Sequence, residues 1–600
     1  MSVESQKNKK DNVSILRTLE GGEKFTFSFH LKSDKFGGID KQFNMCRNLN
    51  ENMSEFVTRL TCNVEKAISK KAKNKKPKPE NIVPNDLEIA FRQNGKSLLD
   101  PSLKIKDIVF EPETKFDICG ECYQIDINPP LVENATLPKT IMTGFMVYPY
   151  KLKLESANRS DSVYEWFVSD EIYVNEKKQD DISKVDNNLP NKKAKQNEQA
   201  NPKHLNWSKR ESGLYFTPTH DDTNRYIKLV CHPKLNDRKG LPYETVSKST
   251  VSEGPKLCPF EQRHVFTKDT TNKDEFRVVS YNLLADLYAD SDFSRTVLFP
   301  QCPSSILAID YRKQLILKEL LGYNADIICL QEVDNKVFDF DLLPILSEKD
   351  EFDGVFDRKG GQVSEGLACF WRTSKFKQLK KQKFILSDSL QSETHFEHMW
   401  NVVKCKEQLR ERMLSRTTAI QIVVLESLVK KNHGLVVGIT HLYFKPDADH
   451  VRLLQTALCM GHLEKTLQNM KESKPDMTFS VILAGDFNST PPFGVLQFMR
   501  EGSINEVHPD WSSCLEEQVL GLSIKHSFSM DSACGTPKFT NYTIGFQDCI
   551  DYIFYETDKL EVKSTVPYPT EDDLKKYQAI PNILFPSDHI ASISNLKWLK

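Results

Sequence analysis

Residues 481–491 read VILAGDFNSTP, and this stretch decides the fold of the C-terminal half of the chain. Its four leading apolar residues predict a strand that is buried on both faces, as in a layered α/β protein. Gly485 ends the strand, and Asp486 and Asn488 follow at once. A charged group at the end of a buried strand is costly unless it is paired or binds a metal. A single strand end of this kind is equally compatible with a turn or a helix cap. The ends of the other strands therefore decide between a functional site and such a structural role.

Other predicted strands of this region end in the same way. Apolar runs predict strands at 276–280, 325–330, 435–440, 479–484 and 551–555, and spacings of three and four predict helices at 311–321 and 451–467. Polar side chains stand at or next to the ends of these runs and before the last apolar run of the chain: Asn282, Glu332, His441, Asp486, Asn488, Asp588 and His589. If the strands are neighbours in a sheet, these groups converge on one rim.

The chemistry of this set fits phosphoryl transfer. Carboxylate and amide oxygens form a hard site that suits magnesium. Magnesium binds a phosphate oxygen, and a carboxylate can orient or deprotonate the attacking water. Imidazoles beside the metal can bind phosphate and transfer protons. The sequence therefore predicts a magnesium-dependent site for phosphoryl transfer in an α/β domain.

The length of 600 residues suggests two to four domains. We predict a flexible N-terminus at 1–20 and a β-rich accessory region at 21–135 that contains a basic loop at 66–80. A β-sandwich-like accessory domain is predicted at 136–255, with a disordered insert at 176–204 that is rich in Asn, Lys, Gln and Asp. Trp166 and Cys231 suggest an immunoglobulin-like pattern there. The catalytic domain is predicted at 270–600.

Composition sets the broad class of the protein. A net charge of −2 gives no global basic field, so affinity for a polyanion must come from local patches or a metal. The 14 cysteines are irregularly spaced, which favours reduced thiols over a disulfide framework. Cys119 and Cys122 have a zinc-like spacing but no partner pair, so we interpret them as structural thiols. No apolar run is long enough to predict a membrane span.

The ordered motifs resemble those of the endonuclease/exonuclease/phosphatase superfamily. They are Ser280-Tyr281-Asn282, Leu330-Gln331-Glu332-Val333, Glu365-Gly366, Thr440-His441-Leu442, Gly485-Asp486-Phe487-Asn488-Ser489-Thr490-Pro491, Asp551-Tyr552-Ile553-Phe554 and Ser587-Asp588-His589. The set covers the whole C-terminal domain in the family's order and is most similar to the deadenylase-like branch. The resemblance implies a four-layered α/β sandwich preceded by a β-rich accessory region.

The resemblance also implies the metal ligands of the site. Glu332 matches the principal magnesium ligand of the family. Asp486 matches the general base or water-positioning carboxylate, and Asn488 beside it lies near metal and phosphate. Asp588 is expected to complete the metal site.

Further roles are implied for the histidines and their neighbours. His589 matches a phosphate-contacting histidine that Asp551 orients, and His441 matches a second one, for which Glu365 is the expected partner on the substrate side. Asn282 matches an amide that positions metal and phosphate. Pro446 and Phe546 fall where related deadenylases hold an adenine base, and such stacking contributes roughly 1–3 kcal/mol per base.

The implied activity is cleavage of 2′,5′-linked oligoadenylate and removal of 3′ poly(A) tails from RNA, with release of AMP. An inositol polyphosphate or phosphoinositide phosphatase is one alternative, but its expected arginine after the Gly-Asp-Phe-Asn element is replaced here by Ser489-Thr490-Pro491. The same continuation disfavours an abasic-site DNA endonuclease. A non-catalytic RNA-binding adaptor would be signalled by loss of Glu332, Asp486 or His589, and all three are present.

The resemblance implies location in the mitochondrial matrix. The N-terminus has an early Glu4 and no arginine before Arg17, whereas mitochondrial presequences are rich in arginine and poor in acids. The cytoplasm is therefore the alternative compartment.

Overall fold

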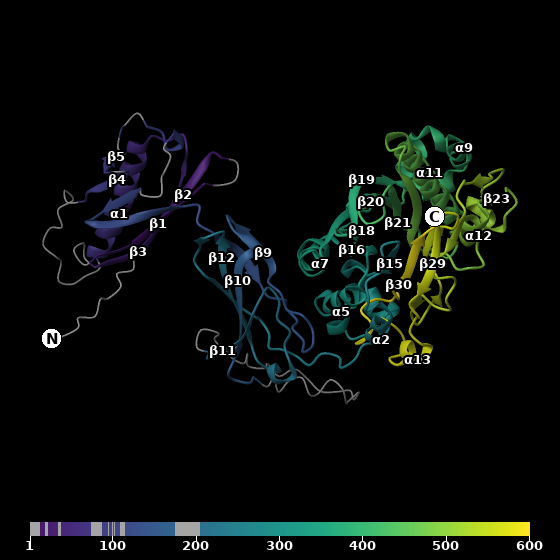
Figure 1. The fold of residues 1–600 in the computed structure, drawn as a ribbon, viewed down its shortest axis with the longest axis horizontal. Helices are drawn as coiled ribbons and strands as arrows, with labels where there is room; N and C mark the ends of the chain where they lie inside the picture. The colour runs from purple at the N-terminus through teal and green to yellow at the C-terminus, as the bar shows by residue number, and fades with distance from the viewer. Residues whose placement is uncertain are drawn as a thin grey trace.

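The computed structural model describes residues 12–18, 22–33, 38–73, 87–93, 95–98, 100, 103–107, 114–173 and 205–599. Figure 1 shows these residues as an N-terminal sheet with one long helix, a β-rich middle part and a large α/β part that ends at the C-terminus. The predicted insert at 176–204 lies outside the described residues.

The N-terminal part is a mixed sheet covered by α1 (Met53–Lys73). Its strand order is β3-β2-β1-β7-β6-β4-β5, with β1 parallel to β7. The helix buries a stripe at spacings of three and four, and its Phe56 ring lies 5.7 Å from that of Phe27. The strands are β1 (Asn12–Thr18), β2 (Lys24–Ser33), β3 (Ile39–Asn48), β4 (Ile89–Gln93), β5 (Lys96–Ser97), β6 (Lys115–Ile118) and β7 (Glu121–Ile127).

Two expectations for this part were wrong. Residues 12–18, within the segment expected to be flexible, form β1 because they pair with both β2 and β7. Residues 66–73, expected to be loop, continue α1 because Val64 and Ile68 extend its buried stripe. Residues 74–80 lie outside the described residues. Cys119 sits in the turn between β6 and β7, and both it and Cys122 are free thiols.

The middle part is built on β10 and β12, which lie side by side in one sheet with the order β11-β10-β12-β13, while β14 also pairs with β12. Trp166 and Cys231 are fully buried on these adjacent strands, and the Trp166 ring stacks on Phe216 at 5.9 Å. A second sheet of β8 and β9 contacts the first through β12 and β14. The strands are β8 (Leu131–Thr136), β9 (Tyr150–Glu155), β10 (Asn158–Ser169), β11 (Trp207–Ser212), β12 (Ile227–Leu235), β13 (Arg238–Lys239) and β14 (Tyr243–Val246).

The C-terminal part contains two sheets packed face to face. The first has the order β17-β18-β16-β15-β30-β29 and the second the order β19-β20-β21-β22-β28-β25. The first sheet consists of β15 (Glu275–Asn282), β16 (Ile327–Asp334), β17 (Phe352–Arg358), β18 (Glu365–Arg372), β29 (Leu560–Thr565) and β30 (Ser592–Trp598). The second consists of β19 (Phe376–Ile385), β20 (Ala419–Ser427), β21 (His433–His441), β22 (Thr478–Asp486), β25 (Met530–Ser532) and β28 (Asp551–Glu556).

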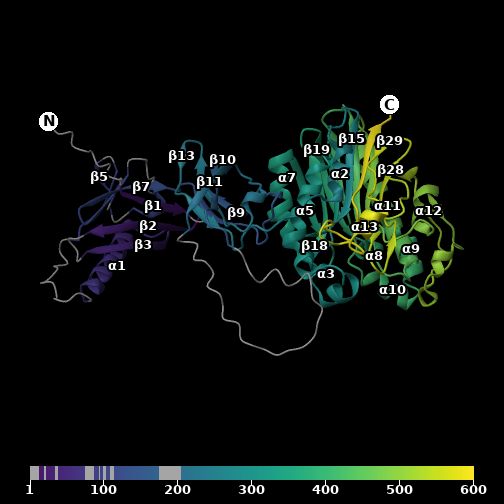
Figure 2. The same cartoon turned by 90° about the horizontal axis from the view of Figure 1, so that it is seen from below.

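Within residues 205–599 helices cover the outer face of each sheet, which gives four layers (Figure 2). The inner faces bury a common core that includes Val278, Cys329, Val437 and Ile482. The longest helices are α5 (Ile309–Gly322) and α11 (Asp449–Ser473), which confirms both predicted helices. The other helices are α2 (Pro259–Arg263), α3 (Asp286–Ala289), α4 (Ser304–Leu307), α6 (Asn335–Val337), α7 (Leu343–Asp350), α8 (Leu386–Ser392), α9 (Glu397–Val403), α10 (Glu407–Leu414), α12 (Gly494–Glu501) and α13 (Glu571–Lys575).

The predicted fold class is confirmed, and its register brings the strand ends together. Asn282 lies opposite Gln331 on parallel strands, and His441 lies opposite Asp486. Asp486 in turn faces Asp551 on the antiparallel β28. The two sheets contact each other through β15 and β16 on one side and β21 and β22 on the other. The polar strand ends of both sheets therefore meet at one edge of the sandwich. Among the described residues, no helix is both long and apolar enough to cross a membrane.

Candidate active site

Asp486 is fixed by the residues directly around it in the chain. A Cβ at Gly485 would come 2.0 Å from the carbonyl oxygen of Thr440 on the neighbouring strand, so this position requires glycine. The Oδ1 atom of Asp486 accepts a hydrogen bond of 2.9 Å from the backbone N–H of Asn488. The carboxylate is thereby oriented before any ligand binds, with Oδ2 left to face the opposite sheet.

Asn282 joins the two sheets at the site. Its Nδ2 donates to Glu332 Oε1 at 3.1 Å and to Asp486 Oδ2 at 3.0 Å, and its Oδ1 accepts from the backbone of Leu284 at 3.1 Å. The side chain is fully buried. One amide therefore holds a carboxylate from each sheet.

Glu332 lies at an irregularity in β16, where the register with β18 shifts between Leu330 and Val333. Its φ of 53° is in the left-handed region, which costs a residue other than glycine roughly 1–3 kcal/mol. Its Oε2 accepts a hydrogen bond of 3.0 Å from Ala285. Strain of this kind persists where the surroundings hold a functional side chain in one orientation.

His441 lies between these two carboxylates. Its Nδ1 is 3.8 Å from Glu332 Oε1, and its Nε2 is 3.6 Å from Asp486 Oδ2. Lys359 lies between His441 and its expected partner Glu365, with Nζ 3.1 Å from His441 Nδ1 and 2.8 Å from Glu365 Oε1. Burial, with the charges of Lys359 and His589, holds the pKa of His441 well below its usual range.

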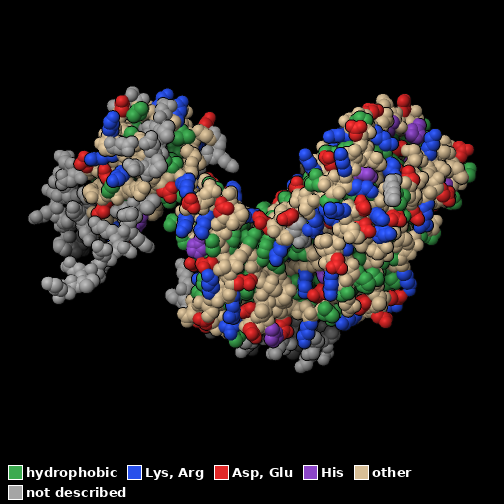
Figure 3. Space-filling view, viewed as in Figure 1, with side chains coloured by type: hydrophobic (Ala, Val, Ile, Leu, Met, Phe, Trp, Pro, Cys, Tyr) green, Lys and Arg blue, Asp and Glu red, His purple; other side chains and the backbone are tan. Residues whose placement is uncertain are grey.

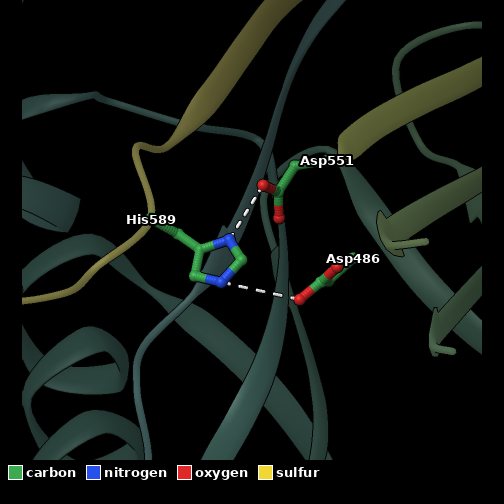
Figure 4. A group of neighbouring side chains, drawn as sticks. All are labelled: Asp486, Asp551 and His589. Atoms are coloured by element: carbon green, nitrogen blue, oxygen red, sulfur yellow. Dashed lines mark hydrogen bonds and ion pairs between the residues drawn. The ribbon is translucent and has the colours of Figure 1, made fainter. Parts of the chain in front are cut away.

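His589 and Asp551 form a buried pair, shown in Figure 4. The Nδ1 of His589 lies 2.8 Å from Asp551 Oδ2, and its Nε2 lies 3.6 Å from Asp486 Oδ2. Burial opposes protonation of the ring, but the charges of Asp551, Asp588 and Asp486 outweigh it and raise the pKa of His589 well above its usual range. The two histidines thus differ: their surroundings favour the charged form of His589 and the neutral form of His441.

Two more of the predicted residues lie beside this centre. Asn488 has a φ of 49° and donates Nδ2 to the carbonyl of Leu442 at 2.9 Å, which leaves its amide oxygen for a metal or a phosphate. Asp588 Oδ2 lies 3.4 Å from Asn541 Nδ2. Asn541 also bridges His589 through the backbone, so a small hairpin of β26 (Asn541–Tyr542) and β27 (Gln547–Asp548) is attached to the histidine segment.

Phe546 lies at the tip of this hairpin, and the residue is 44% exposed. Pro446 is exposed on the loop after His441, where Arg452 donates to its carbonyl at 3.3 Å. The structure gives each residue a fixed and accessible place, and their joint role in holding a base remains a prediction.

The donor set fits a divalent cation. Within the described residues, Asp486, Asp551 and His589 place one ligand atom each within 4.8 Å of one another. Since His589 Nδ1 is already bound to Asp551, we favour the oxygens of Glu332 and Asp486, which share the amide of Asn282. Burial raises the pKa of both carboxyl groups to about 7, against the lowering effect of Lys359 on Glu332 and of His589 on Asp486. A bound cation at these oxygens would offset the buried negative charge.

Two residues that contact the predicted site residues were not identified from the sequence. Lys359 follows β17 and reaches the centre of the site, and Tyr288 donates its hydroxyl to Glu365 Oε1 at 2.9 Å. Neither belongs to a strand-end motif. Arg358 and Lys359, followed by Gly360 and Gly361, are a local signal for the end of a strand, but they do not indicate a contact with the site.

Comparisons with known proteins agree with this geometry. The profile of the Endonuclease/Exonuclease/phosphatase family matches residues 279–589, and that of the 2′,5′-phosphodiesterase 12-like N-terminal domain matches residues 129–252. The chain is 35% identical to 2′,5′-phosphodiesterase 12 of Rattus norvegicus over 603 residues, covering 98% of this chain and 94% of that protein. The chain belongs to the 2′,5′-phosphodiesterase 12 family. It is therefore an enzyme of the phosphodiesterase and exonuclease kind.

One further relative and one solved structure each match 55% of the chain. The chain is 32% identical to the CCR4-Not complex 3′-5′-exoribonuclease subunit Ccr4 of Schizosaccharomyces pombe over 362 residues, covering 55% of this chain and 50% of that protein. A crystal structure of ANGEL2, a 2′,3′-cyclic phosphatase, aligns with a TM-score of 0.44 and 22% identity, covering 55% of this chain and 97% of that one.

Proposed function

We propose that this enzyme is a magnesium-dependent 3′→5′ exoribonuclease that releases AMP from 2′,5′-linked oligoadenylate and from 3′ poly(A) tails. The observation that carries the proposal is the pair of carboxylates, Glu332 and Asp486, held by one amide and faced by Nε2 of His589. The names of its relatives, a 2′,5′-phosphodiesterase and a 3′-5′-exoribonuclease, support the substrate class.

Magnesium is proposed as the metal because carboxylate and amide oxygens are its preferred ligands. Glu332 and Asp486 would hold it, with the amide oxygen of Asn488 beside them. When bound, the ion supplies positive charge to the phosphate and offsets the charge that builds on phosphorus.

Three side chains of the site are proposed to have further roles in the reaction. Asp486 is placed to orient the attacking water and take its proton. His589, held by Asp551, presents a charged Nε2–H to the phosphate oxygens, where a preorganised donor stabilises the transition state. Asn282 keeps the two carboxylates in register, so that the water and the phosphate meet in one geometry.

Base recognition is proposed for Pro446 and Phe546. Both lie exposed on segments anchored next to His441 and His589, respectively. An adenine between an apolar ring and an aromatic face gains roughly 1–3 kcal/mol from stacking. Basic and acidic side chains are interspersed on the face shown in Figure 3, which favours recognition of RNA by the site itself rather than by a broad basic surface.

The alternatives are less well supported. An inositol polyphosphate or phosphoinositide phosphatase is not favoured, because the relative that covers nearly the whole chain is a 2′,5′-phosphodiesterase. A non-catalytic adaptor is not favoured either, because the buried acids and both histidines of the site lie together and are oriented by hydrogen bonds.

The test is an assay of AMP release. The purified chain with magnesium is incubated with 2′,5′-linked and with 3′,5′-linked oligoadenylate, and the products are separated by chromatography. We expect AMP from both substrates and none from the Glu332→Ala or Asp486→Ala variants, whereas the exposed control Asp558→Asn should match the wild type. No AMP from either substrate, with phosphate released from inositol polyphosphates instead, would refute the proposal.

We also propose the mitochondrial matrix as the compartment, on the family resemblance alone. Imaging of the chain with a fluorescent protein at its C-terminus and a free N-terminus tests this. A diffuse cytoplasmic signal would favour the alternative.

A further inference from the structure

Lys359 is held rigidly at the edge where the two sheets meet. Its backbone N–H donates to the carbonyl of Glu365 in the first sheet at 3.2 Å. The next residue, Gly360, donates to the carbonyl of Thr417, just before β20 of the second sheet, at 2.9 Å. A Cβ at Gly360 would lie only 3.3 Å from Thr417 Cα and from Ile385 Cγ2, so the segment has little room to move.

The side chain of Lys359 is mostly buried and has two close partners. Its Nζ lies 2.8 Å from Glu365 Oε1 and 3.1 Å from His441 Nδ1, and the side chain is 10% exposed. Tyr288 donates to the same oxygen of Glu365 at 2.9 Å, so that carboxylate is itself fixed. Glu365 therefore binds the ammonium group of Lys359, which in turn contacts the imidazole ring of His441.

The chemistry of an ammonium group determines the state of the imidazole. Lysine has three donors and no acceptor, so His441 Nδ1 must offer its lone pair to Lys359. A proton on Nδ1 would place two donors 3.1 Å apart. An imidazole keeps at least one ring proton, and with Nδ1 bare this proton is on Nε2, the atom that faces Asp486 Oδ2 at 3.6 Å.

We infer that Lys359 is a positioning residue of the proposed reaction, which fixes His441 as a neutral ring whose Nε2–H donates toward the reacting phosphate. In this arrangement His441 orients a phosphate oxygen by a neutral hydrogen bond. Charge stabilisation is left to His589, which is held by a carboxylate instead of an ammonium group. The inference rests on the proposed function for the identity of the substrate, but the tautomer of His441 does not depend on it.

A purely structural ion pair between Lys359 and Glu365 is the competing interpretation. It predicts that loss of the ammonium group lowers stability without changing the tautomer of His441. The two interpretations therefore differ in a spectroscopic property of one ring and in which kinetic constant changes.

The experiment uses the full chain labelled with ¹⁵N-histidine, with the His441 signals assigned by their absence in His441→Gln. In the wild type we expect the bare nitrogen at Nδ1 and the protonated one at Nε2. Lys359→Met should let the ring populate the other tautomer, and Lys359→Arg should restore the wild-type pattern, because a guanidinium group is also a pure donor. A wild-type ring protonated on Nδ1 would overturn the inference, even if no variant folds.

Kinetics on oligoadenylate supply the second measurement. Loss of an orienting partner of a site residue costs on the order of 10–100-fold in activity, and we expect that loss in kcat with little change in KM. Lys383→Met is the matched control. Lys383 is an exposed lysine of β19, and its Nζ donates to the carbonyl of Arg358 at 3.3 Å. If a folded Lys359→Met protein keeps its kcat and the tautomer of His441, the ion pair between Lys359 and Glu365 has only a structural role. If the wild type releases no AMP, the proposed function fails, while the ¹⁵N spectrum still decides the state of His441.

Discussion

His589 and Asp551 are joined by a 2.8 Å hydrogen bond between Nδ1 and Oδ2, although they lie 38 residues apart, Asp551 at the start of β28 and His589 on the segment that leads into β30. The carboxylate holds the ring with Nε2 toward Asp486 and favours its charged form. Orientation and protonation of His589 thus depend on the same contact.

Replacing Asp551 by Asn should therefore shift the pH dependence of the rate. In the native protein His589 stays protonated up to its raised pKa, so activity that needs the charged ring is lost only as the pH rises through that value. Asp551→Asn removes the first of the charges that raise the pKa, and the alkaline limb of the kcat profile should move to lower pH. The exposed Asp558→Asn is the control, and an unmoved alkaline limb in Asp551→Asn would contradict the assignment.

Magnesium should stabilise the protein through Glu332. A ligand that binds only the native state at 100 times its Kd adds about 2.7 kcal/mol of stability. We expect magnesium to raise the melting temperature of the wild type and chelation to reverse this, with little response in Glu332→Gln. The exposed Glu348→Gln should respond like the wild type. An equal rise in the melting temperature of Glu332→Gln would show that the magnesium ion binds elsewhere.

Gly485→Ala should disrupt the second sheet. The added Cβ would meet the carbonyl oxygen of Thr440 at 2.0 Å, which forces β21 and β22 apart and costs about 3 kcal/mol. Chemical denaturation measures the loss. Gly545→Ala is the control for stability, because nothing lies within 4 Å of its added Cβ. Equal stability of the two variants would show that the strands adjust.

Lys313 should be needed for the packing of the middle part on the catalytic domain. Its buried Nζ lies 3.2 Å from Asp341 Oδ1, and Asp341 also accepts a hydrogen bond from Tyr148 of the middle part. Lys313→Met leaves a buried carboxylate without its cation, which costs about 3–5 kcal/mol. The double variant Lys313→Met/Asp341→Leu should recover part of this loss in thermal unfolding, and no recovery would exclude the buried charge as the cause.

His462 should make the catalytic domain sensitive to acid. Burial and the charge of His395 lower its pKa to about 3, and neither ring nitrogen has a hydrogen-bond partner in the described residues. The unfolded chain takes up a proton near pH 6.5, whereas the native ring does not. Stability from this group is therefore present above about pH 6.5 and falls by about 1.4 kcal/mol per pH unit as the pH drops toward 3.

The variant His462→Phe tests this by denaturation at pH 7 and pH 5. The phenyl ring keeps the stacking on Phe384, whose ring centroid lies 3.9 Å from that of His462, and it cannot be protonated. Its stability should fall less between the two pH values than that of the wild type or of the exposed control His398→Phe. Equal losses in all three proteins would assign the acid sensitivity to other groups.

The rim of polar strand ends could be predicted from the sequence because its signal is local. Each of Asn282, Glu332, His441 and Asp486 follows a run of apolar residues, and buried strands place their ends at the edge of a sheet. The hydrogen bond from Asn282 to Asp486 was not predictable in the same way, since it depends on how one sheet packs on the other.

Lys359 was missed for a related reason. Its place depends on the register of β17 with β18, in which Arg358 lies opposite Gly366, and on the second sheet lying beside it. Nothing in the residues next to Lys359 specifies a histidine 82 positions away. The error over 66–73 has a different cause: the lysines there read as loop, although cations near the C-terminal end of a helix are favourable.

The place of β30 in the first sheet has a consequence for synthesis of the protein. This strand lies between β15 and β29, and the segment that leads into it carries Asp588 and His589. A growing chain that has not yet emerged as far as residue 598 has a gap in the middle of this sheet and an unfinished catalytic edge. A nascent chain therefore has no complete active site until this stretch has left the ribosome.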